Sequence, residues 1–365
     1  MMKFLYSLNN IWNYVIIFSF SVIALLLIYP LFSIFFSSFI DNESGLFTLQ
    51  NYSDILGRRY YRTAIYNSVV VGIAGMVGAL IIGIPLAYFT TRYQIKGKSL
   101  ITTLAILALV SPPFIGAYAW ITMLGSNGWL RHLLQNFGIF IPTIYGPFGI
   151  VLVFSLKFYP FVFLLTSGAL STINVSLEDA ADNLGCNPFT KFIRVTLPLV
   201  FPAVSAGALL AFVLSLADFG TPSIIGRNYK VLSTLAYNLY TSEMGGNPGL
   251  ASTVSIILIF ISLIFVYFQR RLNKRKDYGS SLLNRPTVKK LKKIYSIPVH
   301  FLCYFLVLFS SIPSIVVIFN SFRNTSGPVF KPGFGIDSYR RIIGDVPDAI
   351  FNSFMFSIAS VAMVV

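Results

Sequence analysis

Metal ligands and charged side chains are scarce in this sequence. Its 365 residues include 2 cysteines and 2 histidines, and Cys186, Cys303, His132 and His300 lie far apart, without the spacing of a metal site or a disulfide framework. Asp, Glu, Lys and Arg make up only 11% of the chain, whereas soluble proteins average roughly a quarter. The sequence also lacks a P-loop, a nucleophile elbow and a dinucleotide-binding fingerprint. We therefore expect neither an enzyme nor a metal or cofactor bound by this chain.

Acidic residues are the rarer charge, and the bases are unevenly distributed. The chain has 12 Asp and Glu against 27 Lys and Arg, which gives a net charge of +15. Ten of the bases lie between Arg270 and Lys293, where Asp277 is the single acid. This concentration is typical of a cytoplasmic loop between membrane spans, whereas a nucleic-acid surface spreads its bases among aromatic side chains on a folded face. We expect contact with lipid and none with nucleic acid.

Long apolar runs occupy most of the remaining sequence, since 56% of the residues are hydrophobic. A helix of about 20 apolar residues can cross a bilayer. The runs predict an all-α, polytopic transmembrane bundle, with a cytoplasmic N-terminus. Six spans counted from that side return the chain to the cytoplasm, in agreement with the bases after Arg270. The expected spans are residues 11–39, 64–90, 100–124, 146–170, 202–225 and 251–268.

Residues 176–202 interrupt the apolar sequence with charges and helix punctuation. Gly185 lies where a left-handed residue would end one helix, and Asn187 followed by Pro188 is suited to start a second. We expect two short, angled helices outside the bilayer, which form either an ordinary amphipathic loop or a docking element. The first helix carries an apolar stripe that requires a partner groove: Leu177, Ala180, Ala181 and Leu184.

The order of residues within this segment favours the docking element. It resembles the EAA loop of permease subunits of ATP-binding-cassette importers, which have the MetI-like fold and work with a periplasmic binding protein. In such a loop Glu178 would be a polar contact or helix-dipole partner, Ala181 would allow close approach, and Gly185 would supply the bend. The matching residues are Glu178, Ala180, Ala181, Gly185, Leu197, Pro198 and Pro202.

The resemblance implies a place in the cell inner membrane, with partners on both sides of it. The loop would dock on a cytoplasmic ATPase dimer that uses the ATP, and a periplasmic solute-binding protein would dock at the opposite end. An ion-coupled secondary transporter is the alternative from another class, and it would need no docking loop.

Three further features lie within the expected spans. Pro112-Pro113 predicts a break in the third span, either a structural kink or a gating hinge. Lys157 in the fourth span is expected to face the interior or to reach the membrane surface. Asp218 and Thr221, near the end of the fifth, belong either to a hydrated helix end or to the translocation path.

The sequence around Asp218, Ala-Asp-Phe-Gly-Thr-Pro, resembles the ferric-iron branch of these permeases. That resemblance makes ferric iron the expected cargo. Thiamine, polyamine, phosphonate and sulfate are the alternatives within the family.

The sequence begins to repeat itself at an offset of about 285 residues. The run that ends at Phe39 is matched by one that ends at Phe322, and residues 47–52 are matched by residues 334–339. We expect a first permease unit at 1–268, a basic cytoplasmic linker at 269–295 and the start of a second unit at 296–365. Because Val365 lies in an apolar run and no second EAA loop is present, we expect the second unit to be truncated.

Overall fold

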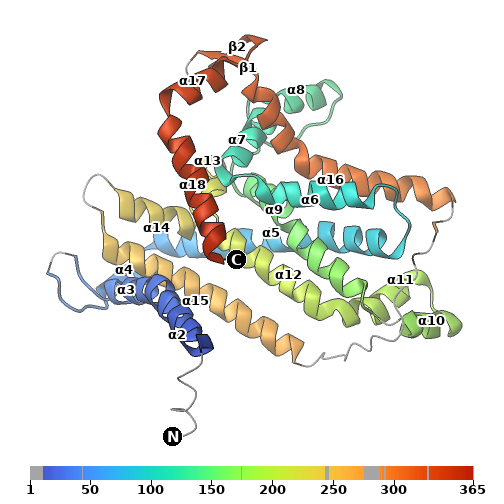
Figure 1. The fold of residues 1–365 in the computed structure, drawn as a ribbon, viewed down its shortest axis with the longest axis horizontal. Helices are drawn as coiled ribbons and strands as arrows, with labels where there is room; N and C mark the ends of the chain where they lie inside the picture. The colour runs from blue at the N-terminus through green and yellow to red at the C-terminus, as the bar shows by residue number, and fades with distance from the viewer. Residues whose placement is uncertain are drawn as a thin grey trace, which may run out of the picture.

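The computed structural model describes residues 11–42, 44–173, 175–242, 246–274, 288, 290–291, 293–326 and 329–364. Most of the expected basic linker, from 275 to 287, and Val365 lie outside these residues. The all-α expectation is confirmed, because helices form nearly all of the described chain and the strands make one hairpin (Figure 1).

Two sets of elements follow one another along the chain. The first set is α2 (Ile11–Ile23), η1 (Ala24–Ile28), α3 (Tyr29–Ser37), α4 (Gln50–Gly57), α5 (Arg59–Arg92), α6 (Lys98–Val110), α7 (Pro113–Leu124), α8 (Trp129–Asn136) and α9 (Pro147–Leu170). The second set is α10 (Val175–Asn183), α11 (Pro188–Lys191), η2 (Phe192–Thr196), α12 (Leu197–Ala217), α13 (Gly220–Ile225), α14 (Leu232–Thr241), α15 (Pro248–Asn273), α16 (Lys293–Ser321), β1 (Arg323–Ser326), β2 (Val329–Phe334), α17 (Asp337–Asp345) and α18 (Pro347–Val364).

Helices α5, α9 and α12 form the centre of the bundle and pack closely against one another. Glycines permit the close approach, as expected for helices that pack in lipid. A Cβ atom at Gly75 of α5 would lie 2.8 Å from Phe154 Cβ of α9, and one at Gly207 of α12 would lie 2.7 Å from Val162 Cα. Without these glycines the three helices could not approach so closely.

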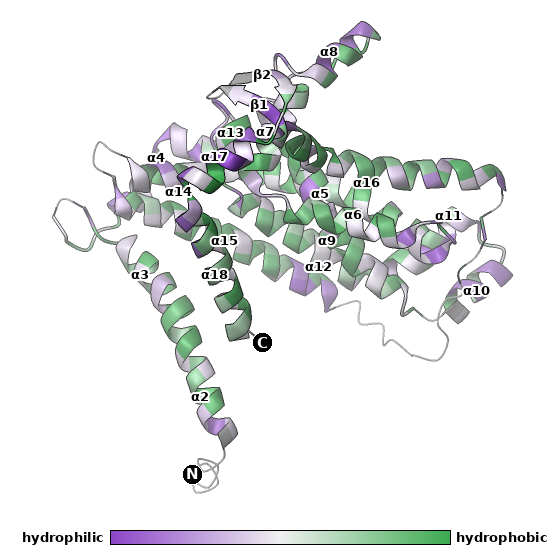
Figure 2. Cartoon of the chain, turned by 45° about the horizontal axis from the view of Figure 1, so that its top comes forward, coloured by the Kyte–Doolittle hydropathy of each residue, from purple (hydrophilic) through white to green (hydrophobic). Residues whose placement is uncertain are grey.

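Hydrophobic residues predominate along the long helices (Figure 2). Many of their large apolar side chains are exposed, as in a bilayer-spanning protein. Among the described residues, six single helical segments are long and apolar enough to cross a membrane, and two bent helix pairs pass the same test together. The six segments are Trp12–Ser37, Arg59–Arg92, Pro147–Leu170, Pro188–Ala217, Pro248–Asn273 and Lys293–Ser321.

The expected third span is broken. The segment Lys98–Val110 meets Pro113–Asn136 at 104°. Pro112 lies between the two helices in an extended conformation, and Pro113 starts α7, where its missing N–H is not needed. The expected break is confirmed, and its role as a hinge stays a prediction.

The expected fifth span, 202–225, was wrong at both ends. The helix that starts at Pro188 continues through η2 and α12 to Ala217. Leu197 donates its N–H to the Phe192 carbonyl five residues back, so a π-helical turn directly precedes Pro198 and the helix continues through it. At the other end, Asp218 adopts an extended conformation and separates α12 from α13.

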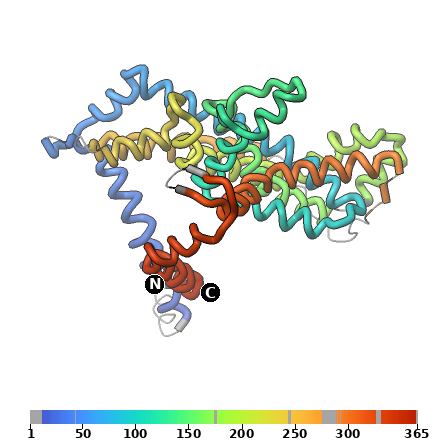
Figure 3. Tube along the Cα trace, turned by 90° about the horizontal axis from the view of Figure 1, so that it is seen from above, coloured from blue at the N-terminus to red at the C-terminus, as the bar shows by residue number. Residues whose placement is uncertain are grey.

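Helix α16 packs along α6 and α7 of the first unit (Figure 3). Its Tyr304 hydroxyl donates to the Lys96 carbonyl at 2.7 Å, and its Ser310 hydroxyl lies 2.9 Å from that of Tyr159 on α9. The segment assigned to the second unit therefore helps to enclose the core of the first.

The sequence repeat has a structural counterpart. The hydroxyls of Ser38 and Tyr52 form a hydrogen bond of 2.8 Å. The residues at the matching places in the second copy, Ser321 and Tyr339, form one of 2.7 Å. The two copies thus share a local contact between the end of one helix and the start of another. The unit boundaries stay a prediction.

Candidate coupling loop and the ion-paired helix break

The bend between α10 and α11 has the expected geometry. Gly185 is left-handed, with φ of +79°. Cys186 donates its N–H to the Ala181 carbonyl at 3.0 Å, which closes the end of α10. Asn187 caps α11, because its side-chain oxygen accepts the Thr190 N–H at 2.7 Å. The expected glycine bend and asparagine cap are both confirmed.

An ion pair fixes the angle between the two helices. Lys191 of α11 places Nζ 2.6 Å and 2.8 Å from the two carboxylate oxygens of Asp182 on α10. The Lys191 side chain is largely buried in this contact. The ion pair therefore stabilises the arrangement of α10 and α11 that the bend at Gly185 produces.

Glu178 fastens the loop to the bundle. Glu178 is buried, with 8% of its surface exposed. Its Oε1 accepts hydrogen bonds from Arg92 Nη2 at 2.7 Å and from the Thr196 hydroxyl at 2.9 Å. Arg92 ends α5 and Thr196 ends η2, so one carboxylate ties α10 to both. The polar contacts that the structure gives Glu178 therefore lie inside the chain, and its part in coupling to the ATPase stays a prediction.

The expected apolar stripe of α10 divides in the structure. Ala181 is buried on the same side as Glu178, whereas Leu177, Ala180 and Leu184 are exposed. Leu184 is 85% exposed, and Phe189 on α11 is 72% exposed. Leu197 and Pro198 are half-buried where η2 joins α12. An exposed apolar flank thus remains on a firmly held loop.

A second polar site lies inside the bundle, where α12 ends. Lys157 Nζ of α9 is 2.5 Å from Asp218 Oδ2, and their side chains are 16% and 3% exposed. The Thr221 N–H donates to Asp218 Oδ1 at 2.8 Å. Asp218 therefore lies at a helix end, where lysine and backbone compensate the charge of its buried side chain. Of the two alternatives, this burial disfavours a hydrated helix end, and a place on the translocation path stays a prediction. Lys157 faces the interior, as expected.

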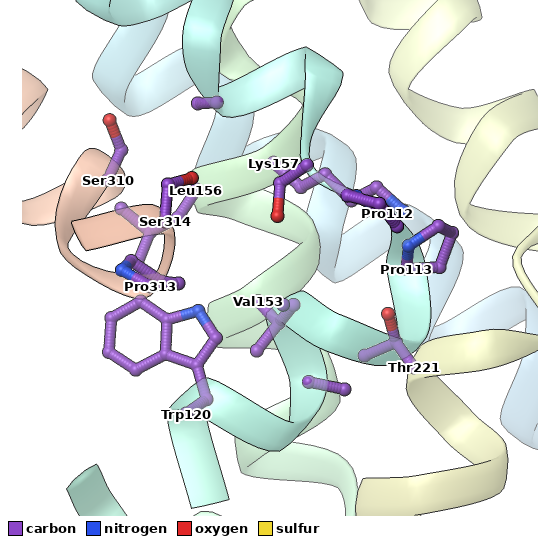
Figure 4. Close-up of a pocket in the computed structure, with 14 residues that line it drawn as sticks. Pro112, Pro113, Trp120, Val153, Leu156, Lys157, Thr221, Ser310, Pro313 and Ser314 are labelled. Carbon is purple, nitrogen blue, oxygen red and sulfur yellow. The ribbon is translucent and has the colours of Figure 1, made fainter. Parts of the chain in front are cut away.

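Two cavities adjoin this pair. One of about 30 Å³ is lined by Ser111, Trp120, Lys157, Thr221 and Ser310 among others, and Figure 4 shows the labelled residues around it. Another of about 410 Å³ is lined by residues that include Lys157 and Asp218. Within the described residues, no three His, Cys, Asp or Glu side chains gather as metal ligands.

Residues 79–278 match the family of binding-protein-dependent transport system inner membrane components. The chain belongs to this family. The matched range runs from within α5 to the end of α15 and contains the whole α10–α11 loop. The family match and the resemblance of the loop therefore agree.

Curated permeases of two cargo types are similar to this chain. The ferric transport system permease protein FbpB of Actinobacillus pleuropneumoniae is 33% identical over 67% of this chain and 36% of its own length. The molybdenum transport system permease protein ModB of Mycobacterium bovis is 31% identical over 56% of this chain and 77% of its own. The chain thus spans about a third of the ferric permease.

A solved structure has the same permease fold. In a bacterial ABC transporter involved in the import of the acidic polysaccharide alginate, one chain superposes with a TM-score of 0.57 at 16% identity. The match covers 73% of this chain and 96% of that one. The expected fold of ABC importer permeases is confirmed.

Two functional contacts of this permease were not predicted from its sequence. The pairing of Arg92 with Glu178 was not expected, and Lys157 was not linked with Asp218. The partners lie 86 and 61 residues apart. For the second pair a signal was available, because Lys157 and Asp218 are each the lone charge of an apolar segment. Buried charges in membrane helices usually pair with one another.

Proposed function

We propose that this chain is the transmembrane unit of an ATP-driven importer and that its α10–α11 loop docks on a separate cytoplasmic ATPase dimer. The observation that carries the proposal is the exposed apolar flank on a rigidly fastened loop. Leu177, Leu184 and Phe189 project from helices that Glu178 and Lys191 hold in place. Apolar side chains that stay exposed outside a membrane usually mark a protein interface.

The connections of the loop give it the properties of a lever. Helix α11 continues through η2 into α12, and Glu178 links α10 to the end of α5 through Arg92. A displacement of the loop by the ATPase would move α5 and α12 with it as packed, rigid elements. The lever supports alternating access driven by ATP that the partner binds.

The cargo we propose is ferric iron, received from a periplasmic solute-binding protein at the end of the bundle opposite the loop. The support is the similarity to the ferric permease and the sequence around Asp218. The similarity to a molybdenum permease shows that related permeases serve other cargoes, and thiamine, polyamine, phosphonate and sulfate remain the alternatives. Membership in a binding-protein-dependent family argues against an ion-coupled secondary transporter.

Single charges placed in the apolar flank test the docking. Leu184→Asp and Phe189→Asp in the full-length, membrane-expressed protein should each reduce co-purification of the ATPase roughly tenfold. Uptake of radioactive ferric iron by the same cells should fall in parallel. Asn183→Asp is the matched control, because it adds the same carboxylate at an exposed site of α10 outside the flank.

The outcomes test the importer assignment and the cargo assignment separately. Retention of the ATPase by both flank variants would show that the loop does not dock there. If the ATPase is lost but wild-type cells take up no iron through this protein, the importer is correctly identified and its cargo is not.

A further inference from the structure

Two broken helices meet beside the Lys157–Asp218 pair. A Cβ atom at Gly220, the first residue of α13, would lie 2.7 Å from Pro113 Cβ at the start of α7. The rings of Phe114 and Phe219 contact each other at 5.7 Å between centroids. Broken helices within a membrane are tolerated where they are buried in protein or line a water-filled space. Here the breaks face two cavities and a buried charge pair.

The two members of the pair are held unequally. Asp218 is fixed, because it lies between α12 and α13, its side chain is 3% exposed, and it accepts the Thr221 N–H at 2.8 Å. Lys157 carries its ammonium on a flexible four-carbon stem. Its side chain lines both cavities. When the pair separates, the lysine is therefore the partner that can move.

The smaller cavity offers new acceptors to the moving ammonium. Hydroxyl groups of Ser111, Ser310 and Thr221 lie in its wall. Thr221 is fully buried, and its Oγ1 has no hydrogen-bond partner among the described residues. A buried hydroxyl without a partner is costly, so this oxygen is available for a ligand or for Lys157.

We propose that the Asp218 carboxylate and the Thr221 hydroxyl form a transient site for a hard, oxygen-preferring cation in transit, and that Lys157 occupies this site as a tethered cation when the cargo is absent. This inference rests on the proposed function, which supplies a cation as cargo. Movement of Lys157 would expose one fixed negative charge to the cavity of about 410 Å³. The incoming cation then replaces the ammonium, and the site stays compensated.

The position of Asp218 favours a cation over an oxyanion. It directly follows α12, and the negative end of a helix dipole attracts cations. An oxyanion would require Lys157 as its ligand and would have to displace the carboxylate, which is the better-held partner. The two cases predict opposite effects of neutralising each residue.

Terbium(III) is a suitable probe, because it prefers oxygen ligands and its luminescence is sensitised by nearby tryptophan. Trp120 lines the smaller cavity together with Thr221. In the purified complex of full-length protein and ATPase, Asp218→Asn should weaken terbium binding roughly tenfold or more. Thr221→Val should weaken it less, because it removes a neutral ligand. Trp120→Phe should reduce the signal strongly while iron uptake continues.

Lys157→Met should tighten terbium binding several-fold, because it removes the tethered competitor and makes the open site the dominant state. Lys157→Gln provides a second variant with an uncharged donor, and it should act in the same direction. Iron uptake should be lost in Asp218→Asn and retained in Lys157→Gln.

Three results would overturn the site. Equal loss of uptake in Asp218→Asn and Lys157→Met, with recovery in the double variant, would identify the pair as structural. Loss with Lys157→Met alone would identify an anion path. Iron uptake through the protein, with terbium binding that ignores Asp218, would refute the site and leave the proposed function standing. Terbium binding that depends on Asp218 without any iron uptake would support the site and refute the cargo.

Discussion

Arg92 with Glu178, and Lys157 with Asp218, form two buried ion pairs with different surroundings. Glu178 accepts a further bond from Thr196 and lines neither of the two cavities beside Lys157, which suits a permanent fastening. Lys157 and Asp218 border open space, which suits a contact that separates. Buried pairs add little net stability, but removal of one partner leaves an uncompensated charge.

Arg92→Met should therefore destabilise the protein by about 3–5 kcal/mol. The measurement is the unfolding free energy, or the shift in thermal midpoint, of the detergent-solubilised protein. Asp54→Asn is the control, because Asp54 pairs with Arg58, whose side chain is 65% exposed, and an exposed pair contributes about 0–1 kcal/mol. Equal effects of the two substitutions would contradict a fastening role for the Arg92–Glu178 pair.

At the scale of elements, glycines have two distinct physical functions. Gly185 is needed for its backbone conformation, since a Cβ atom there would meet nothing within 4 Å. Gly207 is needed for space, since its Cβ would lie 2.7 Å from the Val162 backbone. Gly168, on the exposed side of α9, has neither a positive φ nor a close neighbour. These positions permit matched substitutions.

Gly185→Ala should cost about 1–2 kcal/mol, the strain of a left-handed alanine, and should weaken ATPase binding by changing the angle of the loop. Gly185→Asn should cost less, because asparagine tolerates this conformation. Thermal unfolding and ATPase co-purification measure the two effects. If Gly185→Ala lowers the stability no more than Gly168→Ala does, the bend does not require a left-handed residue.

Gly207→Ala should separate α12 from α9 and cost about 1–3 kcal/mol through overpacking. Gly168→Ala should be neutral or stabilising, because alanine is the better helix former by about 0.5–1 kcal/mol. Denaturation of the two variants in the same detergent provides the comparison. If Gly207→Ala is tolerated equally well, the close packing of the central helices is not limiting.

At the scale of the whole molecule, the loop and the ends of α15 and α16 that flank the basic segment lie toward the same end of the bundle (Figure 1). The positive-inside rule predicts that this end faces the cytoplasm. The cytoplasmic N-terminus stays a prediction. The native cysteines provide a direct test, because Cys186 in the loop is half-exposed and Cys303 in α16 is buried.

A membrane-impermeant thiol reagent should label Cys186 in inside-out membrane vesicles and leave it unlabelled in right-side-out vesicles. Cys303→Ser should label as the wild type does, and Cys186→Ser should remove the signal. Labelling of Cys186 from the outside would reverse the assigned orientation and would exclude the loop as a docking site for a cytoplasmic ATPase.

The sequence by itself determined what depends on neighbouring residues. Apolar runs specified most of the spans, Pro112-Pro113 specified the break in the third, and Gly185 with Asn187 specified the bend of the loop, because helix capping and proline geometry act over a few residues. The order of residues in the loop was also sufficient to indicate the family.

Only the tertiary structure decided which distant groups meet. Packing of α5, α9 and α12 buried Glu178 against Arg92 and brought Lys157 to Asp218. It also divided the stripe of α10 into buried Ala181 and exposed Leu184. A charge in an apolar segment indicates that a compensating group lies nearby, but several helices could supply that group. Three-dimensional packing selects among them, because the electrostatic compensation of a buried charge depends on distance in space and not on separation along the chain.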